Sequence, residues 1–403
     1  MKISSPHTGT SLSILLYLSL AHLFNDAFQS AVSAVYPVIR DQLSLTFGQI
    51  GWIVFVYQIC ASVFQPVAGI VFDKYPRPWY LSAGTISTMT GLVILAFAPS
   101  IHWVMLSVAF VGLGSSVIHP EASRLTHHAS GGRHGLAQSI FQVGGNFGGA
   151  LGPLLAAAIV APHGQRYIVI LAGIAIISLL TKTPVVRWYK SVIRSARTGA
   201  VPPTIIHRVR LTKKKIYFSL FILLVLIFSK HAYTASLGSF YTFYLIEKFS
   251  LTNQESQIFL FVYLLASAAG TFLGGPIGDR FGRKWVIWFS ILGTAPFSLM
   301  MPYANLTWTC VLSVMIGIIL SSAFSAILVY AQELLPTKIG LISGLFFGLA
   351  FGIAGIAAAI LGSLADNNGL EYVYKICAFI PLMGVVAVFL PHVKPRKNDE
   401  YGK

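Results

Sequence analysis

Charged residues are scarce in this chain. Only 10% of its 403 residues are Asp, Glu, Lys or Arg, whereas 55% are hydrophobic, and the mean hydropathy is +0.74. A soluble domain carries roughly a quarter charged residues. The composition therefore excludes an ordinary soluble protein and predicts a protein embedded in a lipid bilayer.

Cysteines are also few, and none has the spacing of a metal ligand. Cys60, Cys310 and Cys377 each fall in an apolar stretch, and no Cys-x-x-Cys motif occurs. We expect core packing from all three, rather than a disulfide framework or a zinc site. Because no nucleophile–base pair or metal-ligand spacing occurs either, we predict that the protein is not an enzyme and needs no cofactor or metal.

Acidic residues are the scarcest charged group, with 12 Asp and Glu against 28 Lys and Arg. The excess of basic residues does not predict nucleic-acid binding, because these residues gather in alternate loops. One set of loops holds Lys74, Arg77, Arg124, Arg133, Arg280, Arg283, Lys284 and Lys338. The opposite loops hold few basic residues, so the positive-inside rule predicts that both termini lie in the cytoplasm.

Long apolar stretches account for most of the chain. They are about 20 residues or longer, enough to cross a hydrocarbon core of roughly 30 Å, and they lack the alternation of barrel strands. We predict an all-α membrane protein with about twelve transmembrane helices. The approximate limits are 12–38, 48–72, 79–98, 102–124, 135–160, 166–187, 215–245, 254–277, 284–302, 306–330, 340–364 and 371–391.

The second half of the chain repeats the first at an offset of 206 residues. Ser44-Leu45-Thr46 recurs as Ser250-Leu251-Thr252, and Asp73-Lys74 recurs as Asp279-Arg280. Two similar membrane halves are typical of secondary transporters, whose substrate site lies between the halves.

We therefore predict two pseudo-symmetric six-helix halves joined by a linker. The predicted domains are an N-terminal half at 1–188, a basic cytoplasmic linker at 189–214, and a C-terminal half with a short cytoplasmic tail at 215–403. The linker has no acidic residue, so we expect it to lie near anionic lipid headgroups. A regulatory binding site in the linker is the alternative.

The repeated loops carry the sharpest motif, Gly-xxx-Asp followed by a basic residue. An Asp in this position can cap the N-terminus of a neighbouring helix, and the basic residues after it can pair with carboxylates. We predict a gating latch composed of Asp73, Arg77, Asp279, Arg280, Arg283 and Glu333.

Both loops resemble motif A of the major facilitator superfamily, although Pro76 stands where the second copy has Gly282. Gly148-xxx-Gly152-Pro153 resembles part of the antiporter motif of that superfamily, with Ala156-Ala157 in place of its last two glycines. The same glycine spacing also serves plain close packing of helices. The resemblance implies the major facilitator fold.

A narrower resemblance covers nearly the whole chain. The segments His22–Asp26, Ser130–Ser139, Phe228–Lys230 and Tyr330–Pro336 resemble those of the bacterial fosmidomycin resistance proteins, which are efflux transporters of the inner membrane. The resemblance implies a multi-pass inner-membrane protein that exports fosmidomycin, an anion with a phosphonate and an N-formyl hydroxamate, and so confers antibiotic resistance.

Ionisable residues inside apolar spans are costly and are functional candidates by default. His22, Asn25, Asp26 and Gln29 share one helix face at i, i+3, i+4 and i+7. We predict that Asp26 and Glu121 couple transport to protons. Static hydrogen bonding to a neighbouring helix is the alternative for Asp26.

Other polar residues of the spans are candidates for binding the substrate. The offset of 206 places Lys230 and His231 at the depth of Phe24 and Asn25, so Lys230 is the expected partner of Asp26 or of a phosphonate oxygen. The complete set of predicted substrate-binding residues is His22, Asn25, Gln29, Arg124, Gln138, Gln142, Asn146, Lys230 and His231.

These features predict a monomeric transporter that works by alternating access and exchanges small anions for protons. Its expected partners are the anionic substrate, protons and the lipid bilayer, and not nucleic acid. The alternative function is a proton-coupled importer or a uniporter of a phosphorylated or sugar-like nutrient.

Overall fold

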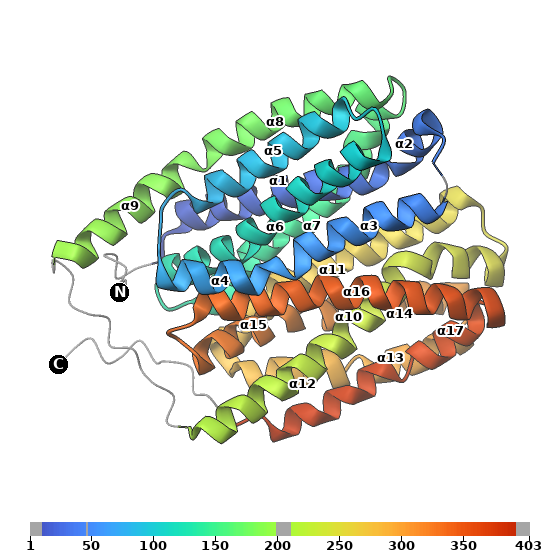
Figure 1. Cartoon of the computed structure of the whole chain (residues 1–403). Helices are drawn as coiled ribbons and strands as arrows, with labels where there is room; N and C mark the ends of the chain where they lie inside the picture. The colour runs from blue at the N-terminus through green and yellow to red at the C-terminus, as the bar shows by residue number, and fades with distance from the viewer. Residues whose placement is uncertain (1–9, 46, 199–210, 392–403) are drawn as a thin grey trace. The chain divides into compact units, whose positions relative to one another are not determined.

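The computed structural model describes residues 10–45, 47–198 and 211–391, and every regular element in this part of the chain is helical (Figure 1). The middle of the predicted linker, 199–210, and the predicted tail from 392 onward lie outside the described residues. The start of the predicted linker belongs to a helix that continues from the preceding span.

In the part of the first half that the structure describes, there are nine α-helices. They are α1 (Leu12–Ala34), α2 (Tyr36–Leu43), α3 (Phe47–Ser62), α4 (Phe64–Lys74), α5 (Tyr80–Ala96), α6 (Ile101–Ala129), α7 (His134–Leu155), α8 (Ile168–Thr181) and α9 (Thr183–Thr198). A π-helical turn, Ala156–Val160, continues α7, and a 3-10 turn, Gln165–Tyr167, precedes α8.

The second half contains eight more. They are α10 (Lys213–Phe249), α11 (Asn253–Phe281), α12 (Arg283–Leu292), α13 (Ala295–Met300), α14 (Leu306–Ser321), α15 (Ala323–Leu334), α16 (Ile339–Asn368) and α17 (Leu370–Cys377). Two 3-10 segments, Met301–Tyr303 and Ile380–Phe389, complete this half. Thr252 caps α11 in a capping box with Glu255, and its hydrogen bonds lower the pKa of the Glu255 carboxyl.

Several of these helices join end to end into longer apolar spans. In the described part of the chain, ten such spans are long and apolar enough to cross a membrane. Helices α1 and α5 stand outside those ten, α5 because it is shorter and α1 because four polar side chains lower its hydropathy. The ten spans and these two helices coincide with the twelve predicted from the sequence, which confirms an all-α membrane protein.

The chain folds as two compact units. The first comprises Met1–Gly131, Ile140–His207 and Leu335–Gly348, and the second comprises Gly132–Ser139, Arg208–Leu334 and Leu349–Lys403. Each unit thus takes in the beginning of one helix from the other half of the sequence, α16 in the first unit and α7 in the second. The predicted domain limits at 188 and 215 remain predictions.

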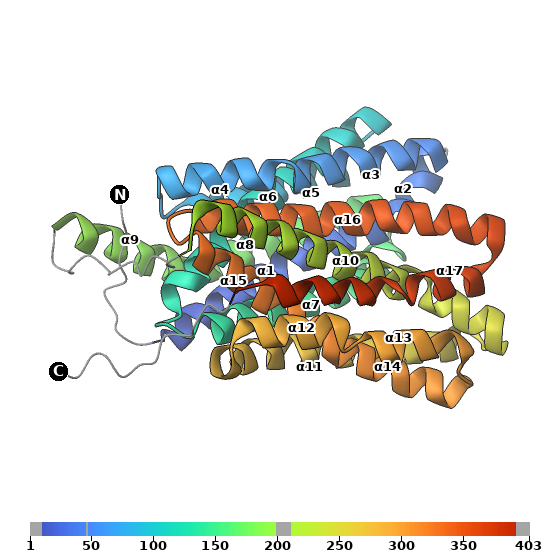
Figure 2. The same ribbon diagram turned by 90° about the horizontal axis from the view of Figure 1, so that it is seen from below.

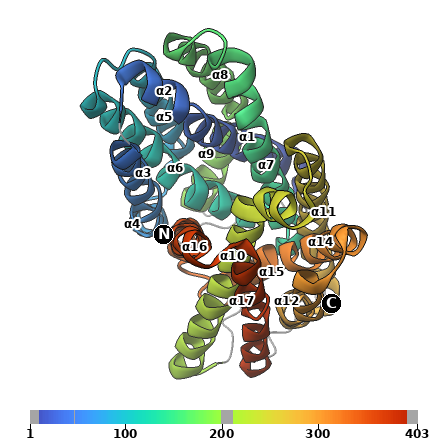
Figure 3. The same cartoon turned by 90° about the vertical axis from the view of Figure 1, so that its right-hand side faces the viewer.

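Within the first unit, α6 lies against α1, α3 and α5 (Figure 3). Glycines permit these contacts, because a Cβ at Gly112 would overlap α3 at Cys60 and one at Gly91 would overlap α6 at Ser107. The close packing holds α6 beside the polar face of α1. In the second unit, α11, α12 and α14 lie side by side (Figure 2).

Candidate functional site

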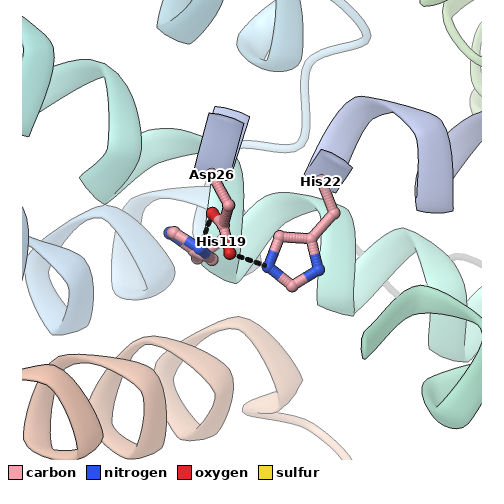
Figure 4. Close-up of side chains that lie close together, drawn as sticks. All are labelled: His22, Asp26 and His119. Carbon is pink, nitrogen blue, oxygen red and sulfur yellow. Dashed lines mark hydrogen bonds and ion pairs between the residues drawn. The ribbon is translucent and has the colours of Figure 1, made fainter. Parts of the chain in front are cut away.

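The polar face of α1 meets α6 at a group of three ionisable side chains, in which a partly buried carboxylate lies between two buried imidazoles. Asp26 lies between two histidines (Figure 4). Its Oδ2 lies 3.2 Å from Nε2 of His22, one turn earlier on α1, and its Oδ1 lies 3.0 Å from Nε2 of His119 on α6. Both histidines are buried. We call His22, Asp26 and His119 the carboxylate–histidine group.

Two amides and a phenol complete the surroundings of Asp26. Asn25 Nδ2 and Gln29 Nε2 donate to Asp26 Oδ1 at 3.0 and 3.2 Å. Tyr57 of α3 donates its hydroxyl hydrogen to Gln29 Oε1. The four polar residues predicted to share one face of α1 therefore do so, and Asp26 is their common centre.

Helix α7 closes the other side of this group. His22 stacks on Phe141 with ring centroids 4.1 Å apart, and its Nδ1 lies 2.9 Å from the Phe141 carbonyl oxygen. Gly145 is the position nearest the group, because a Cβ there would lie within 2.8 Å of Asp26 Oδ2 and closer still to the His22 ring.

The glycine stripe of α7 explains how two helices come so close. A Cβ at Gly144 would overlap Ser19, one at Gly148 would overlap Leu23, and one at Gly152 would overlap Ala31. The stripe that resembles the antiporter motif is thus the surface on which α7 packs against α1.

The carboxylate–histidine group also has the donor atoms of a metal site, since one ligand-type atom from each residue lies within 4.8 Å of the others. Each contact is already explained by a hydrogen bond between a ring nitrogen and a carboxylate oxygen. A metal ion is therefore not needed to account for the geometry.

Glu121 forms a second buried ionic group in the first unit. Arg124 donates to both of its carboxylate oxygens, from Nε and Nη2, at 2.8 Å each, and also to the Tyr189 hydroxyl at 2.8 Å. Glu121 is 1% exposed and Arg124 3% exposed. Because each carboxylate oxygen has an arginine donor, Glu121 is held as part of a tight ion pair.

Lys230 of α10 is a buried cation of the second unit, 7% exposed. Its ammonium lies 5.4 Å from the centroid of the Phe324 ring, and no carboxylate pairs with it among the described residues of its unit. His231 packs edge-on against the same ring, and its buried Nε2 has no hydrogen-bond partner there. Two polar nitrogens from adjacent residues are thus available near one aromatic face.

The amides predicted to line α7 differ in exposure. Gln138 is buried, whereas Asn146 is exposed, and the buried Oε1 of Gln142 has no partner within the described structure. Gln142 is the one of the three with an unused acceptor atom.

The two aspartates of the predicted latch accept hydrogen bonds at two helix beginnings. Asp279 accepts the backbone N–H of Gly135 and Leu136 at the start of α7, both at 2.9 Å. Arg283 bridges Asp279 and Glu333, with Nη2 at 3.0 Å from each carboxylate. The predicted pairing of Glu333 with Arg283 is therefore present.

The first copy of the motif repeats the helix cap without the arginine. Asp73 accepts the backbone N–H of Gly340 and Leu341 at the start of α16, again at 2.9 Å. Arg77 and Arg280 are exposed, and Arg280 lies over the ring of Phe281.

The family of the chain follows from two matches that together span residues 18–403. Residues 18–244 and 222–403 each match the family model described as Major Facilitator Superfamily. The chain belongs to the major facilitator superfamily.

Relatives within the superfamily narrow the assignment. This transporter is 54% identical over 388 residues to the fosmidomycin resistance protein of Escherichia coli (strain K12), which covers 96% of this chain and 95% of the relative. It is 41% identical over 390 residues to the uncharacterized MFS-type transporter YfnC of Bacillus subtilis (strain 168), with 96% and 95% covered. At these identities the transporter belongs to the fosmidomycin resistance protein family, as its motifs predicted.

Solved structures agree on the fold. The structure of the transporter FucP in the outward conformation matches with a TM-score of 0.74 at 15% identity, over 95% of this chain and 99% of that one. The proton:xylose symporter XylE matches with a TM-score of 0.68 at 14% identity, over 96% and 97%. Identities this low support the fold of the transporter and nothing about its substrate.

Sequence reasoning missed His119 as a site residue of this transporter. It is separated from Asp26 by 93 positions and belongs to another helix. The available signal was the position of His119 directly before Pro120 inside an apolar span. An ionisable residue there is costly and is therefore a functional candidate.

Proposed function

We propose that this transporter exports fosmidomycin or related small anions across the bacterial inner membrane in exchange for protons. It would work as a monomer by alternating access, with both termini in the cytoplasm. The name of the relative at 54% identity supports the substrate, and the sorting of basic residues between loops supports the orientation.

One observation carries the exchange mechanism. The first unit holds a partly buried carboxylate between two imidazoles, and the second unit buries an ammonium that has no carboxylate partner among the described residues of its unit. Burying an unpaired charge is expensive, so Lys230 is best explained as a site that a substrate anion neutralises. The carboxylate–histidine group supplies the proton that moves the other way.

The geometry also ranks the proposed substrate contacts. Asn25, Gln29 and Arg124 already donate to Asp26 or Glu121. We therefore propose Lys230 and His231 as the first contacts of the phosphonate. Gln138, Gln142 and Asn146 of α7 would bind the hydroxamate, whose oxygens accept and whose hydroxyl donates.

The second candidate function is a uniporter, or an importer of a phosphorylated or sugar-like nutrient. Electrical energy favours a uniporter, because expelling one charge across 100 mV yields about 2.3 kcal/mol without any proton. Antiport is supported by the carboxylates of Asp26 and Glu121, because ionisable residues inside membrane spans are functional candidates by default.

The test is transport of radiolabelled fosmidomycin in proteoliposomes with separately imposed pH and voltage gradients. We expect a pH gradient alone to drive accumulation against the drug gradient. The matched variants are Asp26→Asn, which should abolish pH-driven accumulation, and Asp366→Asn, which changes an exposed acid of the second unit and should not.

In a sensitive bacterium, expression should raise tolerance and lower accumulation of labelled drug. Unchanged accumulation, with the protein confirmed in the membrane, would remove the substrate assignment. Accumulation that follows voltage alone would leave the substrate and replace the antiporter by a uniporter.

A further inference from the structure

We infer that His22 and Asp26 hold one exchangeable proton between Nε2 and Oδ2, and that His22, rather than His119, is the partner through which Asp26 takes up and loses it. The inference rests on the proposed exchange of protons and names the atoms that perform it. It gives His22 a role in coupling in place of the predicted role in substrate binding.

The first step concerns the tautomer of His22. Its Nδ1 lies 2.9 Å from the Phe141 carbonyl oxygen. A carbonyl oxygen only accepts, so Nδ1 must carry a hydrogen. A neutral His22 therefore has a bare lone pair on Nε2, and this lone pair faces Asp26 Oδ2 at 3.2 Å. The contact is attractive only if a proton lies between the two atoms.

The second step distinguishes the two oxygens of Asp26. Oδ1 accepts three hydrogen bonds, from His119 Nε2, Asn25 Nδ2 and Gln29 Nε2. The interaction of Oδ2 shown by the structure is the contact with His22. A proton carried by the carboxyl group therefore belongs on Oδ2, the oxygen that faces His22.

The third step separates the two histidines. His119 Nδ1 lies 3.0 Å from the Ser115 hydroxyl and 3.2 Å from the Ser115 carbonyl oxygen. The hydroxyl is the nearer partner and can donate to Nδ1, whereas the partner of His22 Nδ1 is a carbonyl oxygen. A neutral His119 can then carry its hydrogen on Nε2 and donate it to Asp26 Oδ1. With the Ser115 hydroxyl as donor, His119 satisfies its contact without an added proton, an arrangement that the carbonyl partner of His22 does not offer.

The side chains that surround this pair come from several helices. His119 faces it from α6, and Tyr57 of α3 reaches it through Gln29. Helix α7 presents Phe141 and Gly145, and α16 presents the ring of Phe347 against both histidines. Lys182, which follows α8, is buried and lines a small cavity together with Asn25, and the Glu121–Arg124 ion pair lies further along α6.

Loss of this proton has a mechanical consequence. The pair changes from neutral overall to one negative charge, and the Nε2 lone pair then repels the carboxylate. His22 cannot move toward α7, because its ring stacks on Phe141 and Gly145 already lies against it. Deprotonation is therefore relieved by a shift of α1 relative to α7, which would tie proton release to a helix movement.

The test uses the full-length protein in lipid bilayers without substrate, labelled with ¹⁵N-histidine. Solid-state NMR then reports the protonation of each imidazole nitrogen. At neutral pH we expect the His22 Nε2 signal, identified by its loss in His22→Gln, to be that of a protonated or proton-sharing nitrogen, and we expect it to persist in His119→Gln. The inference would be overturned if NMR showed a bare Nε2 on His22 while infrared spectroscopy showed an ionised Asp26.

A metal ion is the competing explanation and has its own readout. The protein is first treated briefly with a chelator. Adding Zn²⁺ alone should then leave the histidine signals unchanged. Stoichiometric binding of Zn²⁺ that is lost in His22→Gln would show that a cation, and not a proton, joins the pair.

A second measurement connects the pair to transport. Exchange in proteoliposomes is followed between about pH 6 and pH 8, the range in which imidazoles titrate. A one-proton step changes the rate by at most roughly tenfold per pH unit, and we expect this dependence in the parent protein and in His119→Gln but not in His22→Gln. Retention of the full dependence in His22→Gln contradicts the inference. Absence of any drug transport, with the NMR signal present, contradicts only the proposed function.

Discussion

Asp73 and Asp279 make the same bonds at equivalent places in the two halves of the chain. Each carboxylate accepts the backbone N–H groups of two successive residues at a helix start, with all four distances at 2.9 Å. An anion at a helix N-terminus is stabilised by both the hydrogen bonds and the helix dipole. Only Asp279 has, in addition, an arginine that ties it to a second carboxylate.

Asp279→Asn should shift the balance between conformations more than it weakens substrate binding. Loss of the charge removes about 1–2 kcal/mol of stabilisation at the helix start, or roughly a five- to thirtyfold change in the population ratio. Distances between spin labels would report the populations, and equilibrium binding would report affinity.

Two variants sharpen this comparison. Gly135→Ala should act like Asp279→Asn, because a Cβ there would lie 2.8 Å from Asp279 Oδ1. Asp73→Asn, the equivalent change in the first half of the chain, should shift the conformational populations by a smaller amount than Asp279→Asn. The reason is that no ion pair involves Asp73 in the described part of the chain. Abolished binding with unchanged populations would show that Asp279 is not a latch.

Gly145→Ala should impair pH-driven transport, whereas Gly149→Ala should not. Both lie on α7, and alanine favours a helix over glycine by about 1 kcal/mol at either position. A Cβ at Gly145 would collide with the His22 ring, while a Cβ at Gly149 meets nothing within 4 Å. Equal transport rates in the two variants, at equal expression, would mean that α7 has room to move away from His22.

Lys230→Ala should weaken phosphonate binding strongly, and Lys230→Arg should retain part of it. A charge-assisted hydrogen bond contributes about 1.5–3 kcal/mol, so the dissociation constant should rise roughly ten- to a hundredfold. Isothermal titration measures it, with the exposed Lys190→Ala as control. Unchanged affinity in Lys230→Ala would place the anion elsewhere.

Glu121→Gln tests whether Glu121 couples protons or only balances Arg124. Removing one partner of a buried pair leaves an uncompensated charge and costs about 3–5 kcal/mol, so we expect a lower melting temperature. The double variant Glu121→Gln/Arg124→Gln should recover stability. If it also recovers pH-driven accumulation, Glu121 is structural, and Asp26 is the coupling carboxylate.

The spans, the repeat and the motifs could be predicted from the sequence, because each depends on local composition or on a fixed offset. Apolar length alone located α10, expected at 215–245 and observed at Lys213–Phe249. The i, i+3, i+4, i+7 spacing placed His22, Asn25, Asp26 and Gln29 on one face of α1, since helical geometry fixes which side chains share a face. The offset of 206 also indicated that Asp73 and Asp279 occupy equivalent positions in the two halves of the sequence.

Partners from distant helices were beyond sequence reasoning. Nothing in the chain marks His119 as the neighbour of Asp26, because the contact depends on how closely α6 packs against α1. The same holds for Ser115, which makes a neutral His119 sufficient, and for the Phe141 carbonyl, which makes a neutral His22 insufficient. The sequence by itself determined that a carboxylate would be buried in the first span, whereas hydrogen-bond geometry between packed helices decided which atom of which histidine must share its proton.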